Sequence, residues 1–183
     1  MLVNTVTLAN TQKIQLIDEF FTAEPMLALT RICDDFAQHN TRWTQLEGFN
    51  RSRWVYDCKS TEFELVTEYL TSPALLHQLS ELTGSQVRLT NTAMWVDSAG
   101  IGQLRPHRET ATGFLAQVFV TRQTDNLNGT TFYNDGRQVL FQLPYRNNFG
   151  WLFEGDRVLH GRQADVTPGL NRFSVMMWYA RTQ

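Results

Sequence analysis

In the first half of the chain, hydrophobic residues recur every three to four positions, which is the spacing of helices that bury one face. Three segments show the pattern: EPMLALTRICDDFAQHN (residues 24–40), STEFELVTEYL (60–70) and SPALLHQLSELTG (72–84). The last of these also carries boundary signals, with Ser72 as N-cap, Pro73 at the first helical position and Gly84 as stop. The pattern predicts that residues 1–85 form mainly helical support and that the last two helices pack on one side of a sheet.

From about residue 86 onward, short runs rich in β-branched and aromatic residues alternate with clusters of Gly, Asn, Asp and Pro. Such runs, with no helices between them, are typical of an antiparallel sandwich or jelly roll. The runs are QVRLTNTAMWV, FLAQVFVTR, GTTFYND, RQVLFQL, FGWLFEG, RVLHGRQ and NRFSVMMWYA. We therefore expect a single α+β domain over residues 1–183, with a double-sheet β-core over residues 86–183 and helices backing it.

Composition narrows the class of function. The chain has 183 residues, 42% hydrophobic and 19% charged, which is enough to bury the core of one domain. Its 16 basic and 18 acidic residues are mixed along the sequence, and the net charge of −2 argues against a nucleic-acid partner. A basic leader and an apolar run of membrane-spanning length are both absent. We therefore expect a cytoplasmic protein with no membrane partner, in which Cys33 and Cys58 are reduced packing residues.

Ionisable residues gather in the segment LRPHRETATGF, just before one of the expected strands. In an extended segment alternate side chains share a face, so the following residues would point the same way: Gln103, Arg105, His107 and Glu109. An imidazole beside a carboxylate suits a divalent metal. The same pair, taken alone, is also typical of an ordinary protein surface.

Two later strands carry further residues that a metal site at His107 and Glu109 would need. His160 lies in DRVLHGRQ, on the same strand face as Arg162. Two imidazoles and one carboxylate form the facial triad typical of non-haem iron(II), which leaves three coordination positions open. Arg172 follows on another expected strand. Each residue alone suits a surface position, but their order and spacing together favour a metal site.

On these residues the chain resembles the 2-oxoglutarate- and iron(II)-dependent dioxygenases with a double-stranded β-helix core, particularly the prolyl-hydroxylase-like branch. The family pattern is His-x-Asp, a second His roughly fifty residues later, then an Arg that is usually followed by Ser. The resemblance covers about residues 72–181. It implies Fe(II) bound by His107, Glu109 and His160, and 2-oxoglutarate bound through its distal carboxylate by Arg172 and Ser174.

The resemblance implies an enzyme that couples oxidative decarboxylation of 2-oxoglutarate by O2 to hydroxylation of a small molecule or a peptidyl side chain. The chain departs from the family at Glu109, where Asp is usual, and at Ser98, where many members carry Tyr. Glu109 keeps the ligand type and charge, and it argues against a halogenase, in which Gly or Ala frees a site for halide.

Two alternatives belong to other classes. One is a non-catalytic β-helix module that binds another ligand, and the other is a cupin-type metal enzyme that does not use 2-oxoglutarate. Arg172 argues against the cupin, which has no need of that arginine.

Residues near the expected metal site indicate what kind of substrate the protein binds. Gln103 and Arg105 are expected to flank the metal, and an arginine there favours an anionic group on the primary substrate, such as a free amino acid's carboxylate. The alternative is that Arg105 pairs with a structural acid, either Asp97 or Glu109. Trp95 is a candidate for a substrate cradle, although an aromatic residue in a strand is more often part of the core.

Overall fold

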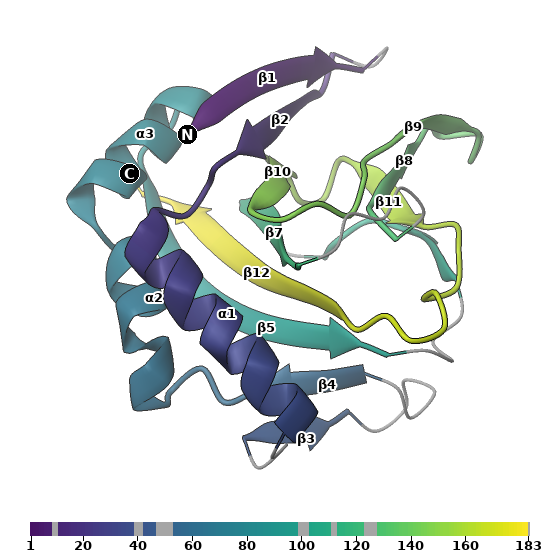
Figure 1. Cartoon of the computed structure of the whole chain (residues 1–183). Helices are drawn as coiled ribbons and strands as arrows, with labels where there is room; N and C mark the ends of the chain where they lie inside the picture. The colour runs from purple at the N-terminus through teal and green to yellow at the C-terminus, as the bar shows by residue number, and fades with distance from the viewer. Residues whose placement is uncertain are drawn as a thin grey trace.

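The protein is built in three layers: helices cover one face of a large sheet, and a smaller sheet lies against its other face (Figure 1). Among the helices described, none is long and apolar enough to cross a membrane. The computed structural model describes residues 1–8, 11–38, 42–46, 53–98, 103–110, 113–122 and 128–182.

The large sheet is antiparallel, and its central strands are buried on both faces. Over the described residues its strand order is β1-β2-β10-β7-β12-β5-β4-β3. The strand bounds are β1 Leu2–Thr7, β2 Lys13–Asp18, β3 Trp43–Gln45, β4 Arg53–Tyr56, β5 Val87–Asp97, β7 Phe114–Val120, β10 Phe149–Glu154 and β12 Arg172–Arg181. All of β7 and most of β12 is buried, because the helices cover one face and the small sheet covers the other.

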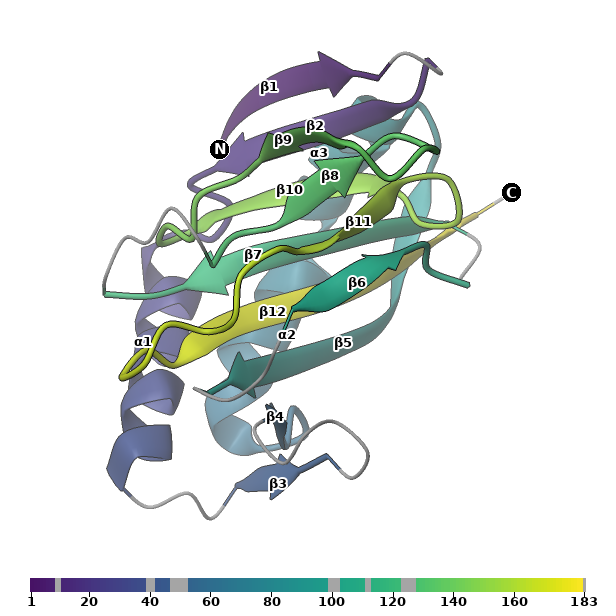
Figure 2. The ribbon, with the colours of Figure 1, turned by 90° about the vertical axis from the view of Figure 1, so that its right-hand side faces the viewer.

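The small sheet has the strand order β6-β11-β8-β9 over the described residues. Its bounds are β6 Leu104–His107, β8 Thr131–Tyr133, β9 Val139–Gln142 and β11 Leu159–Arg162. Figure 2 shows this sheet in front of the large one. Two facing antiparallel sheets with helices on the outer face of one confirm the predicted α+β jelly roll.

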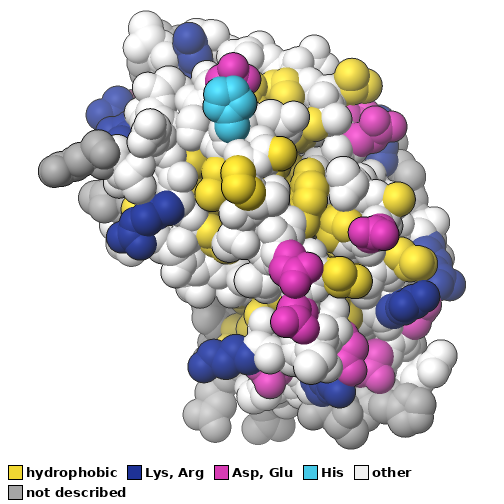
Figure 3. All heavy atoms as spheres, turned by 90° about the vertical axis from the view of Figure 1, so that its left-hand side faces the viewer, with side chains coloured by type: hydrophobic (Ala, Val, Ile, Leu, Met, Phe, Trp, Pro, Cys, Tyr) yellow, Lys and Arg dark blue, Asp and Glu magenta, His cyan; other side chains and the backbone are white. Residues whose placement is uncertain are grey.

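The three predicted helical segments are present. They form α1 Ala23–Gln38, η1 Thr61–Phe63 leading into α2 Glu64–Leu70, and α3 Pro73–Thr83. In α3 the hydroxyl of Ser72 accepts a hydrogen bond from the backbone N–H of Leu75, and Gly84 ends the helix at φ 67°. On the outer helical face, hydrophobic and acidic side chains are interspersed (Figure 3).

The expectation of mainly helical support over residues 1–85 missed β1, β2, β3 and β4. The strand β2 pairs with both β1 and β10 and contributes to two cores. Ile17 packs with the core under the helices, whereas Ile14 packs with the core between the sheets. These strands span only three to six residues each, so their sequence pattern was too short to stand out.

Replacing Ile17 by Ala tests whether β2 belongs to the cooperative fold. Ile17 is fully buried, so Ile17→Ala should lower the free energy of unfolding by about 2–5 kcal/mol through lost burial and a residual cavity. Leu65→Ala on α2 is the control, because Leu65 is 49% exposed and its loss should change stability by less than about 0.5 kcal/mol. Urea unfolding measures both, and equal effects would show that β2 does not share the core.

Candidate metal centre and its arginine-lined cavity

Two histidines meet because their strands pair. His107 on β6 and His160 on β11 are direct partners in an antiparallel ladder. Side chains in such a position lie on the same face and in contact, and the two ring centroids are 4.5 Å apart. The pairing register therefore brings together two imidazoles that are far apart in the sequence.

Both imidazoles are oriented by backbone carbonyls. Nδ1 of His107 lies 3.0 Å from the carbonyl oxygen of Arg105, and Nδ1 of His160 lies 3.3 Å from that of Val158. Because a carbonyl only accepts, Nδ1 carries a proton in each ring, and Nε2 is the nitrogen that can bind a metal once it is deprotonated. Both Nε2 atoms face Glu109, at 3.4 and 3.7 Å from its Oε1.

Glu109 lies beyond the end of β6, so the extended pattern expected from the sequence ends at His107. Its backbone N–H donates to the carbonyl oxygen of Gly155 at 3.1 Å, which fixes the chain there. From this position the longer side chain brings a carboxylate oxygen close to both imidazoles. The ligand atoms of His107, Glu109 and His160 all lie within 4.8 Å of one another. This donor set fits a facial metal triad.

In the metal-free triad Glu109 and His160 are in the forms that bind a cation, whereas Glu109 favours the protonated form of His107, so a metal would displace that proton. The hydrogen bond with Glu109 raises the pKa of His107, and the same bond lowers the pKa of Glu109. Burial lowers the pKa of His160 to about 4, and the charge of His107 adds to this effect. At neutral pH His160 is therefore neutral and Glu109 ionised, which are the metal-binding forms.

The triad opens into a cavity of about 620 Å³ between the sheets, a size typical of ligand pockets. Gln103 and Arg105 are exposed residues that line it, and Trp95 and Arg172 also contribute to its wall. Ser174 is not part of the lining; its hydroxyl accepts a hydrogen bond from Nε2 of Gln117 at 3.1 Å.

Arg105 does not pair with either of the acids considered from the sequence. Among the described residues, Asp97 pairs with other arginines and Glu109 pairs with the two histidines of the triad. The Arg105 side chain is exposed and lines the cavity near the metal triad.

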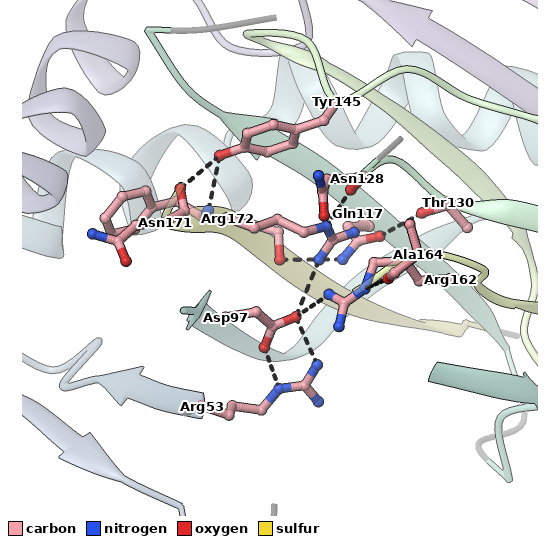
Figure 4. A network of polar contacts seen from close by, with 12 residues as sticks. Arg53, Asp97, Gln117, Asn128, Thr130, Tyr145, Arg162, Ala164, Asn171 and Arg172 are labelled. Atoms are coloured by element: carbon pink, nitrogen blue, oxygen red, sulfur yellow. Dashed lines mark hydrogen bonds and ion pairs between the residues drawn. The ribbon is translucent and has the colours of Figure 1, made fainter. Parts of the chain in front are cut away.

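Asp97 is the centre of a buried ionic cluster (Figure 4). It is the last residue of β5, and its direct partners on the two neighbouring strands are Arg53 of β4 and Arg172 of β12. Nε and Nη2 of Arg53 donate to Oδ1 and Oδ2 of Asp97 at 2.5 and 2.9 Å. Nη1 of Arg162 and Nη1 of Arg172 reach Oδ2 at 2.8 and 3.5 Å.

The cluster keeps Asp97 ionised. Burial, the largest single effect, raises the pKa of Asp97, but the hydrogen bonds and charge of Arg53, with the charges of Arg172 and Arg162, together bring that pKa below its usual value. Sequence reasoning missed Arg53, which carries no local signal. Arg162 did carry a local signal, since it shares a strand face with His160.

A second polar chain crosses the wall of the cavity. Nε1 of Trp151 donates to the hydroxyl of Thr130 at 2.9 Å, and that hydroxyl donates to Oε1 of Gln117 at 3.0 Å. These bonds, with the one from Gln117 to Ser174, fix the orientation of the Gln117 amide. Sequence reasoning missed Gln117, although it is the one polar residue in the apolar run FLAQVFV.

No protein-family model matches the chain, and no curated protein matches it in sequence. Its fold does resemble solved structures. A prolyl hydroxylase from Trichoplax adhaerens, in complex with a hypoxia inducible factor peptide fragment, aligns with a TM-score of 0.70 and 13% identity over 94% of this chain and 85% of that one.

Two further structures contain small molecules. The epimerase SnoN in complex with Fe3+, alpha-ketoglutarate and nogalamycin RO aligns with a TM-score of 0.67 and 15% identity, over 92% of this chain and 78% of that one. HygX from Streptomyces hygroscopicus, with nickel, 2-oxoglutarate and hygromycin B bound, aligns with a TM-score of 0.66 and 13% identity, over 94% of this chain and 84% of that one. The predicted resemblance to the double-stranded β-helix oxygenases is therefore confirmed at the level of fold.

Removing either histidine should remove the metal. His107→Ala or His160→Ala leaves two of three ligands, so binding of about one iron(II) per chain should be lost while the fold is retained. His77→Ala is the control, since His77 lies on α3 and pairs at the surface with Glu81. Metal analysis after anaerobic loading and circular dichroism measure the two properties. Unchanged metal content in both triad variants would refute this assignment.

Proposed function

We propose that the protein is a 2-oxoglutarate-dependent iron(II) oxygenase that hydroxylates a small molecule or a peptidyl side chain. One observation carries the proposal: the triad of His107, Glu109 and His160 opens into the same cavity as the buried Arg172. A metal site and a guanidinium facing one space suit a ligand that chelates at one end and is anionic at the other.

At the metal, the protein would leave coordination positions open for other ligands. Two neutral imidazoles and one carboxylate occupy three positions and leave iron(II) with one net positive charge, which suits an anionic bidentate keto acid. Bound iron would supply oxygen activation, driven by oxidative decarboxylation of the keto acid. The carbonyls of Arg105 and Val158 keep both Nε2 atoms aimed at this position.

Arg172 is the proposed partner of the distal carboxylate. Its side chain is buried, so a planar, permanently charged donor is presented away from water. Nε of Arg172 is already used, since it donates to the carbonyl oxygen of Asn128 at 2.5 Å, and this bond fixes the plane of the guanidinium. Ser174 then acts through Gln117, which lines the cavity while Ser174 holds its amide.

The primary substrate is proposed to enter past Gln103, Arg105 and Trp95, which line the cavity on the side of β5 and β6. Arg105 is the proposed contact for an anionic group of that substrate, as in a free amino acid. HygX and SnoN were solved with hygromycin B and nogalamycin RO, and these structures support a small molecule as readily as a peptide.

Substrate-free turnover tests the reaction class. With iron(II), O2 and 2-oxoglutarate, the protein should release succinate slowly, because uncoupled decarboxylation needs only the chelate. Arg172→Ala should raise the 2-oxoglutarate requirement by a factor of ten or more, corresponding to about 1.4 kcal/mol or more, with iron content unchanged. If wild-type protein neither releases succinate nor develops a visible chelate band under anaerobic conditions, a binding module or a cupin-type enzyme is the better description.

Arg105 and its neighbour Arg108 form a matched pair for testing substrate charge. Arg105→Ala should weaken binding of an anionic substrate by about 1.5–3 kcal/mol, the value of a hydrogen bond to a charged group. Arg108→Ala should have no such effect, because Arg108 pairs with Asp135 at 2.5 Å and does not line the cavity. The assay is substrate-stimulated succinate formation with amino acids and their amides. Equal stimulation by the amides would contradict the role of Arg105.

A further inference from the structure

Asp97 is already satisfied by one arginine. Arg53 binds it through two nitrogens, one on each carboxylate oxygen, which is the strongest geometry available to this ion pair. Arg162 and Arg172 add two more positive charges at Oδ2. Neutralising Asp97 therefore does not explain why two further guanidiniums are buried beside it.

Arg162 and Arg172 are placed to act on one ligand. Their Nη1 atoms converge on Oδ2 of Asp97, so the two guanidiniums are neighbours. Nη2 of Arg53 also donates to Oδ2, but Arg53 approaches from the other side of the carboxylate (Figure 4). Arg162 is 2% exposed and Arg172 is 6% exposed, yet both line the cavity that holds the metal triad, as Arg53 also does. Their backbones come from opposite sheets, so the closeness of the two side chains does not follow from a shared strand.

Each of the two arginines is held in place by a carbonyl as well as by Asp97. Nε of Arg162 donates to the carbonyl oxygen of Ala164 at 3.0 Å, and Nε of Arg172 donates to that of Asn128. Burial lowers the pKa of Arg172 to about 10, the charge of Asp97 opposes this effect, and the charge of Arg162 adds to it. Two like charges held together away from water favour the entry of another anion.

We propose that Arg162 is a second co-substrate-binding residue, which shares the distal carboxylate of 2-oxoglutarate with Arg172. This inference rests on the proposed function. The carboxylate enters between two guanidiniums that Asp97 holds on one side, and the keto acid end reaches the triad. Because β11 carries both His160 and Arg162, one strand contacts both ends of the ligand.

The test compares two keto acids on nickel-loaded protein, which does not turn over. 2-Oxoglutarate and 2-oxopentanoate have the same chain length and the same chelating end, but only the first has a distal carboxylate. Calorimetric titration gives both dissociation constants. Arg162→Met should raise the dissociation constant of 2-oxoglutarate about 10- to 100-fold, as expected when one of two buried charge partners is lost, and leave that of 2-oxopentanoate unchanged.

Arg53→Met is the matched control, because Arg53 is as buried as Arg172, also lines the cavity and also binds Asp97, but on the side of the carboxylate away from Arg162 and Arg172. If Arg162 acts on the ligand, Arg53→Met should weaken 2-oxoglutarate binding much less than Arg162→Met. Equal weakening by the two variants, or equal weakening of both keto acids by Arg162→Met, would overturn the inference and make Arg162 structural.

Arg162→Lys provides a second variant in case Arg162→Met does not fold. It keeps the charge but not the two-pronged geometry, so its dissociation constant for 2-oxoglutarate should lie between those of the wild type and a charge-free site. A wild-type affinity for 2-oxoglutarate in this variant would also overturn the inference. Failure of the wild-type protein to bind either keto acid would refute the proposed function itself, whereas tight wild-type binding that responds to Arg172 alone would refute only the role of Arg162.

Discussion

The geometry of the cavity depends on the ion pairs of one buried carboxylate, that of Asp97. It stands at the end of β5, between Arg53 of β4 and Arg172 of β12 in the same sheet, and it reaches Arg162 of β11 in the opposite sheet. Removing one partner of a buried pair leaves an uncompensated charge and costs about 3–5 kcal/mol. The cluster therefore fixes how the two sheets meet at one end of the cavity.

The metal end depends on the same strand. β11 pairs with β6 through His160 and His107, and two residues later its Arg162 joins the cluster of Asp97. His160 and Arg162 are two residues apart on β11, so strand alternation places both side chains on the face that lines the cavity. A shift of β11 by one residue would turn both side chains away from the cavity at once. The separation of the two ends is thus set by the backbone of a single strand.

Local signals in the sequence predicted the helices and the β-core strands correctly. Ser72, Pro73 and Gly84 define α3 through short-range chemistry, and alternation in the later runs locates the strands of the jelly roll. The three triad residues, which the sequence order placed at a metal site, lie together in the structure. Arg53 was not predictable, because its place beside Asp97 depends on the pairing of a four-residue strand that is distant in sequence.

Ser174 and Gln117 show a different limit of sequence reasoning. The family resemblance implied that the side chain of Ser174 would reach the co-substrate, but it could not show which group stands between Ser174 and the cavity. The neighbour is supplied by the register of β7 against β12, in which Gln117 is opposite Met176 and its side chain turns to the Ser174 hydroxyl. Side-chain contacts of this kind depend on pairing partners and rotamers, and both are determined by the packed core rather than by either strand alone.

The arrangement of charge also determines whether the arginines lose their water during folding or during ligand binding. Arg162 and Arg172 are stripped of most of their water when the protein folds, and Asp97 with the carbonyls of Ala164 and Asn128 replaces part of that hydration. A carboxylate that enters the cavity then meets donors that are already oriented and already dry, so little further ordering is needed at binding. The burial of like charges therefore lowers the stability of the ligand-free fold. Because the same charges are poorly hydrated there, it also strengthens their attraction for an anionic ligand.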